Sequence, residues 1–191
     1  MITTKSFEDL GVKESLGQHL ATLGLENASE IQEKCIPLVL DGKDIFALAE
    51  TGSGKTGAFA IPIIQQITQD GEVENHHEEK IALPHYVVLS PTRELAQQTH
   101  KVFSDIGNNF DVMSTCIIGG ESIEKQKELL GAFPQVVVAT PGRLLDLIKQ
   151  KSLKLKDCKA IVFDEADRLF DMGFKKEIEG ILNSTNKSRQ I

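Results

Sequence analysis

The run from Ala49 to Thr56 contains the residue types of a phosphate-binding loop. It reads Ala49, Glu50, Thr51, Gly52, Ser53, Gly54, Lys55 and Thr56. Glycines allow successive backbone N–H groups to point at one anion, and the N-terminus of a following helix adds unpaired donors and a favourable dipole. Lys55 would reach the outer phosphates, and the Thr56 hydroxyl would ligate Mg²⁺. The pattern therefore predicts a site for a nucleoside triphosphate and its magnesium ion.

The segments on either side of this loop support the prediction. An apolar run, Ile45–Leu48, enters the loop, and a helix-forming segment that contains Ala58 and Phe59 leaves it. The order of strand, glycine-rich turn, Lys-Thr and helix separates such a site from a glycine-rich turn with a chance Lys-Thr pair. The strict pattern begins with glycine, whereas this chain has Ala49. Alanine is compatible with the loop if that residue keeps a negative φ.

A second cluster, of carboxylates, follows the apolar run Ala160–Phe163. Asp164, at the expected end of that strand, can hold Mg²⁺ through its water shell. Glu165 is placed to orient or deprotonate an attacking water, and Asp167 would connect the site with neighbouring loops. The alternative is an acidic helix N-terminus, where carboxylates are favourable in any protein. Together with the phosphate-binding loop, the cluster favours an ATPase site.

The elements that must position these residues alternate along the chain. The strand candidates are Ile45–Leu48, Tyr86–Leu89, Val112–Ile118, Val136–Ala139 and Ala160–Phe163. The helical patterns that follow them are Lys55–Gln69, Thr92–Ile106, Glu121–Leu130, Arg143–Lys149 and the region after Asp167. Apolar runs without alternation suit strands buried on both faces, so we expect an α/β fold in which a mostly parallel sheet carries helices on both faces. Ligand sites in such sheets lie at the carboxyl ends of the strands.

Two further segments flank this alternation. The region from Phe7 to Leu40 predicts two helices, and the second opens at Ser29 with a capping box in which Gln32 closes the helix N-terminus. The segment from Asp70 to Lys80 is rich in charge, so we expect a mobile acidic surface loop there.

Composition restricts the possible partners. The net charge of −7 argues against capture of nucleic acid by the whole surface, and one Tyr without any Trp argues against a base-stacking platform. A nucleic acid would therefore be bound through its backbone by a few placed groups. No apolar run approaches the roughly 20 residues of a membrane span, so no membrane partner is expected. Three scattered cysteines, Cys35, Cys116 and Cys158, indicate reduced thiols, and we expect a cytoplasmic protein.

With these residues in place, the chain resembles the first RecA-like domain of the DEAD-box ATP-dependent RNA helicases, a P-loop NTPase fold, over almost its whole length. The acidic cluster spells the four letters that name the family. The matching motifs, in order, are Ala49–Thr56, Pro91–Ala96, Gly119–Gly120 with Gln126, Thr140–Arg143 and Asp164–Asp167. The resemblance implies an RNA-stimulated ATPase that locally unwinds RNA duplexes, with ATP as substrate and Mg²⁺ as its metal ion.

The resemblance also assigns RNA contacts. The implied residues are Pro91, Thr92, Arg93, Gly119, Gly120, Gln126, Thr140, Pro141, Gly142 and Arg143. Their hydroxyl, guanidinium and amide donors suit the sugar-phosphate backbone, which positions a strand without reading its sequence. Taken singly, the Pro-Thr and Thr-Pro-Gly pieces also read as turn and helix-start signals. As a set that matches the family, they favour RNA binding.

In this family an upstream Phe and a Gln within a Gly…Ile-Gln element read adenine, and Phe7 and Gln32 stand at the matching positions. Residues 1–40 are therefore expected to form adenine-recognition helices, and residues 41–191 the RecA-like domain. The chain departs from the family at Ala28-Ser29-Glu30, where Pro-Thr-Pro is usual. Ser29 keeps a hydroxyl cap, but the loss of both prolines removes rigidity.

Family members continue into a Ser-Ala-Thr motif and a second RecA-like domain that supplies arginine fingers. The four arginines of this chain, none in a motif of that kind, are Arg93, Arg143, Arg168 and Arg189. We therefore expect a first domain that ends before the Ser-Ala-Thr motif, has the second domain as partner, and leaves a gap in the sheet beside Ala160–Phe163. Alone it should bind nucleotide, hydrolyse it very slowly and unwind nothing, because an arginine finger contributes roughly 10³–10⁵ in rate.

Two other functions are consistent with parts of the pattern. An ATP-gated RNA clamp or scaffold for ribonucleoprotein assembly, with little unwinding, would use the same motifs. A small-nucleotide P-loop kinase would explain the phosphate-binding loop but would leave Pro91–Ala96 and Thr140–Arg143 without a role.

Overall fold

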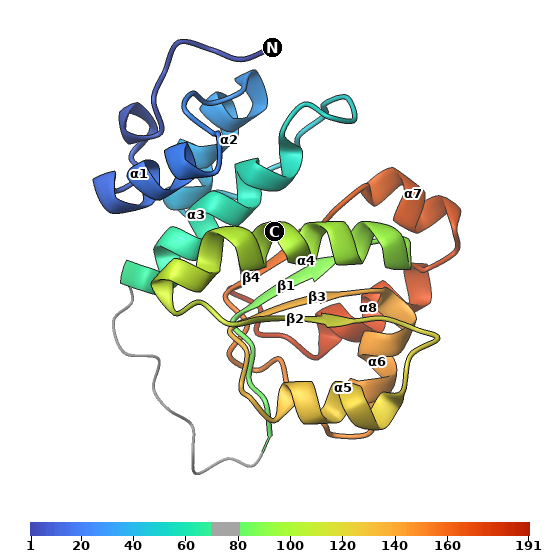
Figure 1. The fold of residues 1–191 in the computed structure, drawn as a ribbon. Helices are drawn as coiled ribbons and strands as arrows, with labels where there is room; N and C mark the ends of the chain where they lie inside the picture. The colour runs from blue at the N-terminus through green and yellow to red at the C-terminus, as the bar shows by residue number, and fades with distance from the viewer. Residues whose placement is uncertain (70–80) are drawn as a thin grey trace.

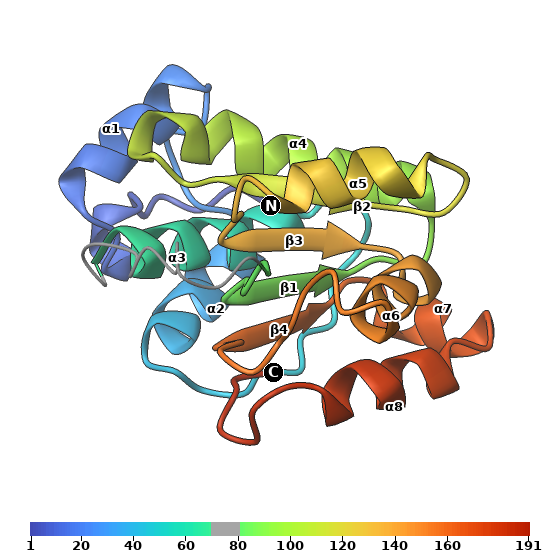
Figure 2. The same ribbon diagram turned by 90° about the horizontal axis from the view of Figure 1, so that it is seen from below.

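A parallel β-sheet forms the centre of the molecule. The computed structural model describes residues 1–69 and 81–191, so the acidic segment predicted as a mobile loop lies outside the described residues. The sheet contains β1 (Tyr86–Leu89), β2 (Ser114–Ile117), β3 (Val136–Ala139) and β4 (Ala160–Phe163). Its strands are ordered β2-β3-β1-β4, and all three pairings are parallel (Figure 2). This arrangement confirms the predicted α/β fold.

Helices cover both faces of the sheet (Figure 1). The helices are α1 (Glu14–Thr22), α2 (Glu30–Leu40), α3 (Lys55–Gln69), α4 (Arg93–Gly107), α5 (Ile123–Leu130), α6 (Pro141–Lys149), α7 (Ala166–Asp171) and α8 (Lys175–Asn183). Two short 3₁₀ helices, η1 (Glu8–Leu10) and η2 (Asn108–Phe110), complete the set in the described residues. None of the helices in these residues is long and apolar enough to cross a membrane.

The core is divided by the sheet into two clusters. Val88 and Val138 pack with α1 to α4 on one face, whereas Val87 and Val137 pack with α5, α6 and α8 on the other. Because successive side chains of a strand point to opposite faces, uninterrupted valine runs supply both clusters at once. This burial on two sides is why the strands read as continuous apolar runs in the sequence.

The predicted strand Ile45–Leu48 is wrong, because these residues form no strand. Ile45 donates its backbone N–H to the carbonyl of Ile191 (2.9 Å), but Phe46 and Leu48 are 84% and 83% exposed. A strand needs a neighbouring row of donors and acceptors. Between this segment and β4 lie Gln190, whose carbonyl accepts from Ile161 (3.0 Å), and Ile191, and these two residues are too short a run to pair with it as a strand.

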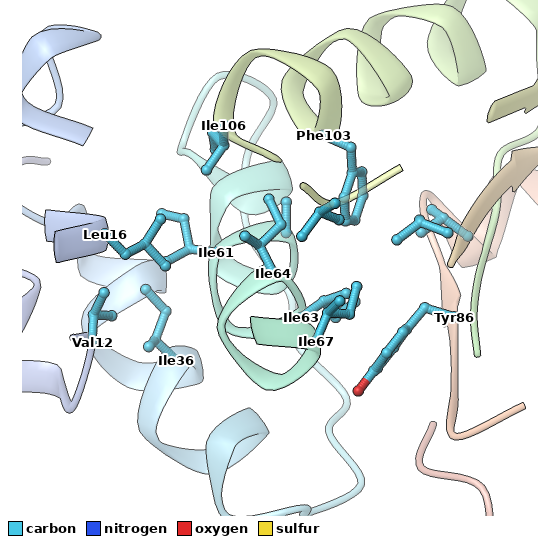
Figure 3. Close-up of a cluster of buried hydrophobic side chains, with 14 of the residues drawn as sticks. Val12, Leu16, Ile36, Ile61, Ile63, Ile64, Ile67, Tyr86, Phe103 and Ile106 are labelled. Atoms are coloured by element: carbon cyan, nitrogen blue, oxygen red, sulfur yellow. The ribbon is translucent and has the colours of Figure 1, made fainter. Parts of the chain in front are cut away.

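The N-terminal helices are joined to the rest of the molecule through α3. Figure 3 shows Ile61 and Ile64 of α3 between Leu16 and Ile36 on one side and Phe103 on the other. Each of these five side chains is at most 3% exposed. Residues 1–40 and the sheet therefore share one hydrophobic cluster, with α3 in the middle.

A buried amide reinforces this junction. Gln65 of α3 is 2% exposed, accepts a hydrogen bond from the Lys13 backbone N–H (2.7 Å) and donates one to the Gly11 carbonyl (2.8 Å). Both backbone groups belong to the turn before α1. Removing such a side chain leaves a buried donor and a buried acceptor without partners, which is more costly than losing a single exposed hydrogen bond.

We predict that Gln65→Met lowers the free energy of unfolding by about 1–3 kcal/mol. The substitution keeps the side-chain volume but leaves the Gly11 carbonyl and the Lys13 N–H without a hydrogen-bond partner. Gln69→Met is the matched control, since Gln69 is exposed on the same helix and should change the free energy by less than about 0.5 kcal/mol. Urea unfolding followed by circular dichroism measures both. Equal losses in the two variants would contradict a structural role for the Gln65 amide.

Candidate functional site

The sheet register brings the loops that follow β1, β3 and β4 to one edge. The first residue of each loop donates its backbone N–H to the last residue of a neighbouring strand. These bonds join Thr140 to Ile117 (3.0 Å), Ser90 to Ala139 (2.9 Å) and Asp164 to Leu89 (2.9 Å). The three loops therefore begin level with one another, and the predicted site residues within them share one edge, at the carboxyl ends of the strands.

The phosphate-binding loop has the backbone that its glycines predict. Gly52 and Gly54 have φ values of 82° and 92°, in the left-handed region where a side chain is strained. The Ser53 N–H donates to the Glu50 carbonyl (3.2 Å), and α3 begins at Lys55, as predicted. The Ser53 hydroxyl is buried and has no hydrogen-bond partner. A buried, unpaired hydroxyl in a glycine-rich loop is available to bind an anion such as phosphate.

A cavity of about 610 Å³ joins this loop to the acidic cluster. Lys55, Asp164, Glu165 and Asp167 line it, together with Ala49, Glu50 and Thr51 of the loop. The other predicted loop residues, Gly52, Ser53, Gly54 and Thr56, are not among its lining residues. Its volume lies in the range of small-molecule sites. The Lys55 ammonium donates to the Ala49 carbonyl (2.7 Å), so the cation is held at the loop. Sequence reasoning predicted two half-sites, and the structure brings them into one cavity.

Asp164 is a buried carboxylate at the end of β4, only 7% exposed. The pKa of Asp164 is raised, mainly by burial and also by the charge of Glu165, although a hydrogen bond from the Thr99 hydroxyl (3.2 Å) and the charge of Lys55 lower it. A cation beside this carboxylate would offset the cost of burying its charge. Within residues 1–69 and 81–191, no three His, Cys, Asp or Glu side chains form a metal-binding group.

The donor set nevertheless fits Mg²⁺. This ion uses one or two protein oxygens and completes its shell with phosphate and water. The Asp164 carboxylate and the half-buried Thr56 hydroxyl supply oxygens of that kind. A magnesium ion held here would accompany a bound phosphate rather than occupy a closed protein cage.

Glu165 has a strained backbone. Its φ and ψ are 51° and 56°, a left-handed conformation that is rare for a residue with a side chain. The strain persists because Asp164 is fixed in the sheet and because the Glu165 carbonyl accepts a hydrogen bond from the Leu169 N–H in the first turn of α7 (3.0 Å). Its carboxylate is 25% exposed and contacts Arg168 (3.3 Å). Such strain concentrates at functional sites.

The glutamine assigned to adenine reading contacts the phosphate-binding loop directly. Gln32 is 6% exposed, accepts from the Ser29 N–H (2.9 Å) and donates to the Gly54 carbonyl (3.0 Å). The Gln32 half of the predicted capping box is formed, and the same amide also holds the loop. The Ser29 hydroxyl is buried without a hydrogen-bond partner, so its predicted role as a helix cap is wrong. Phe7, in contrast, is 1% exposed and packs in the core rather than along the cavity. Its contact with adenine stays a prediction and would require the ring to be uncovered.

Gly57 is a residue that sequence reasoning missed. A Cβ at this position, in the first turn of α3, would approach the Gln32 amide nitrogen to 2.6 Å. The glycine therefore leaves room for Gln32 to reach the loop. A glycine inside a helix costs about 1 kcal/mol relative to alanine, and that cost was the available signal in the sequence.

The candidate RNA residues form two contacting pairs of loops. In the first pair, the Arg93 guanidinium packs so closely over Gly120 that a Cβ there would collide with it. Thr92 caps α4 by accepting from the Leu95 N–H (3.2 Å), and its neighbour Pro91 is buried. The Thr92 hydroxyl thus caps the N-terminus of α4. A glycine is required at position 120, because φ is 81° and Arg93 packs against it.

In the second pair, Arg143 donates to the Glu121 carbonyl and to the Gln126 side chain, both at 3.0 Å. Gln126 is 1% exposed and donates in turn to the Ile118 carbonyl (2.8 Å). Gln126 therefore holds the loop that contains Gly119, and its amide is not presented to solvent. Thr140, which is 8% exposed, and Pro141 begin α6, with Gly142 half-buried beside them.

The chain is similar to proteins of a known family. The sequence model described as DEAD/DEAH box helicase matches residues 29–191. A solved structure, of a DEAD box protein from the hyperthermophile Methanococcus jannaschii, superposes with a TM-score of 0.84 at 38% sequence identity. The match covers 97% of this chain and 48% of that one.

Curated relatives are similar over nearly the whole chain. The ATP-dependent RNA helicase DBP10 of Ajellomyces capsulatus is 42% identical over 96% of this chain, which corresponds to 20% of the relative. The RNA helicase CrhR of Synechocystis sp. is 40% identical over 98% of the chain, and RhpA of Helicobacter pylori is 41% identical over 97%. The chain spans 36% of each of these two bacterial proteins.

The strain at Glu165 gives a stability prediction. Glu165→Gly and Glu165→Ala both remove the carboxylate and its contact with Arg168, but only glycine relieves the left-handed backbone. We expect the glycine variant to be more stable than the alanine variant by about 1 kcal/mol in urea unfolding. An alanine variant as stable as the glycine variant would show that the conformation is not strained.

Proposed function

The chain belongs to the DEAD/DEAH box helicase family, and we propose that it is the nucleotide-binding domain of an ATP-dependent RNA helicase. The observation that carries the proposal is the single cavity in which Lys55 faces Asp164 and Glu165. A cation for phosphates, a carboxylate for a metal ion and a carboxylate for water are the parts of a P-loop ATPase. The contacting RNA-type loops lie at the same edge of the sheet.

In the proposed ATPase, the loop from Gly52 to Gly54 surrounds the phosphates with backbone N–H groups, and Lys55 leaves the Ala49 carbonyl to bind their outer oxygens. Thr56 and Asp164 would hold Mg²⁺, which would neutralise phosphate charge when bound. Glu165 orients the attacking water and accepts its proton. Gln32 connects base recognition to the loop, because its amide already bonds to Gly54.

We propose that the ATP is used to hold and locally unwind RNA. Arg93 brings its guanidinium group to the loop at Gly120, and Arg143 brings its guanidinium group to the loop at Glu121. These groups suit a sugar-phosphate backbone, and the net charge of −7 leaves little attraction for nucleic acid elsewhere on the surface. A second RecA-like domain of the same protein is the proposed partner that completes the site. We place the protein in the cytoplasm, because all three cysteines are free thiols.

Two variants test the proposed roles in the full-length protein. Lys55→Ala should lose ATP binding, because it removes the cation from the loop. Glu165→Gln should keep ATP binding and ATP-dependent retention of single-stranded RNA, but lose RNA-stimulated hydrolysis by about 100-fold or more, because it removes the acceptor of the water proton.

Filter binding of labelled RNA and phosphate release measure the retention and hydrolysis. Lys125→Ala, at an exposed position of α5, is the control and should behave as the wild type. Normal turnover by Glu165→Gln would reject its assigned role, and an ATPase without RNA stimulation would reject the helicase proposal.

A further inference from the structure

The Asp164 carboxylate is held from a second element, helix α4. The Thr99 hydroxyl donates to Asp164 Oδ2 at 3.2 Å, and the two residues are 1% and 7% exposed. Thr99 is separated from Asp164 by 65 positions in the chain. A hydrogen bond between buried groups so distant in sequence fixes the relative placement of α4 and the end of β4.

Thr99 acts on this carboxylate from behind the cavity. Asp164 lines the cavity, whereas Thr99 is not among the lining residues. The Asp164 backbone is already fixed by its bond to Leu89 (2.9 Å), so the side-chain torsions are its main remaining freedom. The Thr99 hydroxyl limits that freedom without touching a ligand. A β-branched side chain in a helix has few χ1 rotamers, which makes Thr99 a stiff support.

The helix that carries Thr99 begins in a candidate RNA loop. Thr92 caps α4 and Arg93 is its first residue, about two turns before Thr99. The intervening helix is anchored by Ala96, which is fully buried, and Phe103 anchors the turn that follows. A displacement of the Thr92–Arg93 loop would therefore reach Thr99 through a rigid element.

We propose that Thr99 is a positioning residue that orients the Asp164 carboxylate toward its metal ion and mechanically connects that carboxylate, through α4, to the Thr92–Arg93 loop. The inference rests on the proposed ATPase function. It adds a hydrogen bond between the nucleotide site and the helix that begins in a candidate RNA loop. Outer partners of metal ligands orient the ligand, and their loss typically weakens metal binding by about 10- to 100-fold.

Binding of a fluorescent ATP analogue to this chain, in Mg²⁺ and in EDTA, tests the orienting role. The quantity of interest is the dissociation constant in EDTA divided by the dissociation constant in Mg²⁺, because this ratio reports how much the metal ion strengthens binding. Thr99→Val removes the hydroxyl at nearly constant volume and should reduce this ratio about 10-fold, while leaving the affinity in EDTA unchanged. Thr99→Ser keeps the hydroxyl and should restore the wild-type ratio. Thr115→Val, at another buried threonine in β2, should not change it.

The outcomes separate the inference from the proposed function. A wild-type chain that binds the analogue in neither buffer rejects the nucleotide site itself. If the wild type binds with a clear Mg²⁺ dependence, an unchanged ratio in Thr99→Val overturns the inference. An equal loss of affinity in both buffers also overturns it, because Thr99 would then only support the fold. A Thr99→Ser variant with the same reduced ratio as the valine variant would overturn it as well. Serine keeps the hydroxyl, so the loss could not be assigned to that group.

Discussion

The functional edge of this protein depends on the parallel pairing of four short strands. At the carboxyl ends of the strands, the carbonyls of Leu89, Ala139 and Ile117 each accept a hydrogen bond from the first residue of the loop that follows the neighbouring strand. A parallel register that slipped by one residue would turn the valine side chains to the wrong faces and separate these loop starts. The buried valine runs therefore position the chemistry, although none of them touches a ligand. Both hydrophobic clusters contribute to fixing this register.

At this edge the molecule keeps groups that are unfavourable without a ligand. Asp164 carries a charge that burial disfavours, Glu165 has a strained backbone, and the Ser53 hydroxyl lacks a partner. A phosphate with its metal ion would relieve the first and the last of these costs together. The surrounding sheet and α3 hold the groups in place before any ligand arrives, which is the expected arrangement for a preorganised site.

The sequence predicted the parts of the site that depend on local backbone chemistry. The glycines around Ser53, the start of α3 at Lys55 and the closure of the α2 N-terminus by Gln32 follow from short-range rules, and the structure shows each of them. Strand existence was also predictable from apolar runs, except for Ile45–Leu48. That segment has the composition of a strand, but a strand also requires a neighbour, and no local pattern reports whether one is present.

The contacts that sequence reasoning did not find connect positions far apart in the chain. Gln65 bonds to the turn before α1, Gly57 makes room for Gln32, and Thr99 supports Asp164. In the sequence Gln65 and Thr99 are ordinary helical residues and Gly57 is only an unfavourable one, because each role depends on a partner 25 or more positions away. Only the fold shows which partner that is.

The proposed function requires an ATP site and an RNA site at the same edge of the sheet. Hydrogen–deuterium exchange of the full-length protein, with an ATP analogue and single-stranded RNA added separately and together, measures this arrangement. We expect nucleotide to protect residues 50–56 and 164–165, and RNA to protect residues 91–93, 119–121 and 140–143. Protection by RNA at the opposite edge of the sheet, or no change in the loop from Ala49 to Thr56 with nucleotide, would contradict it.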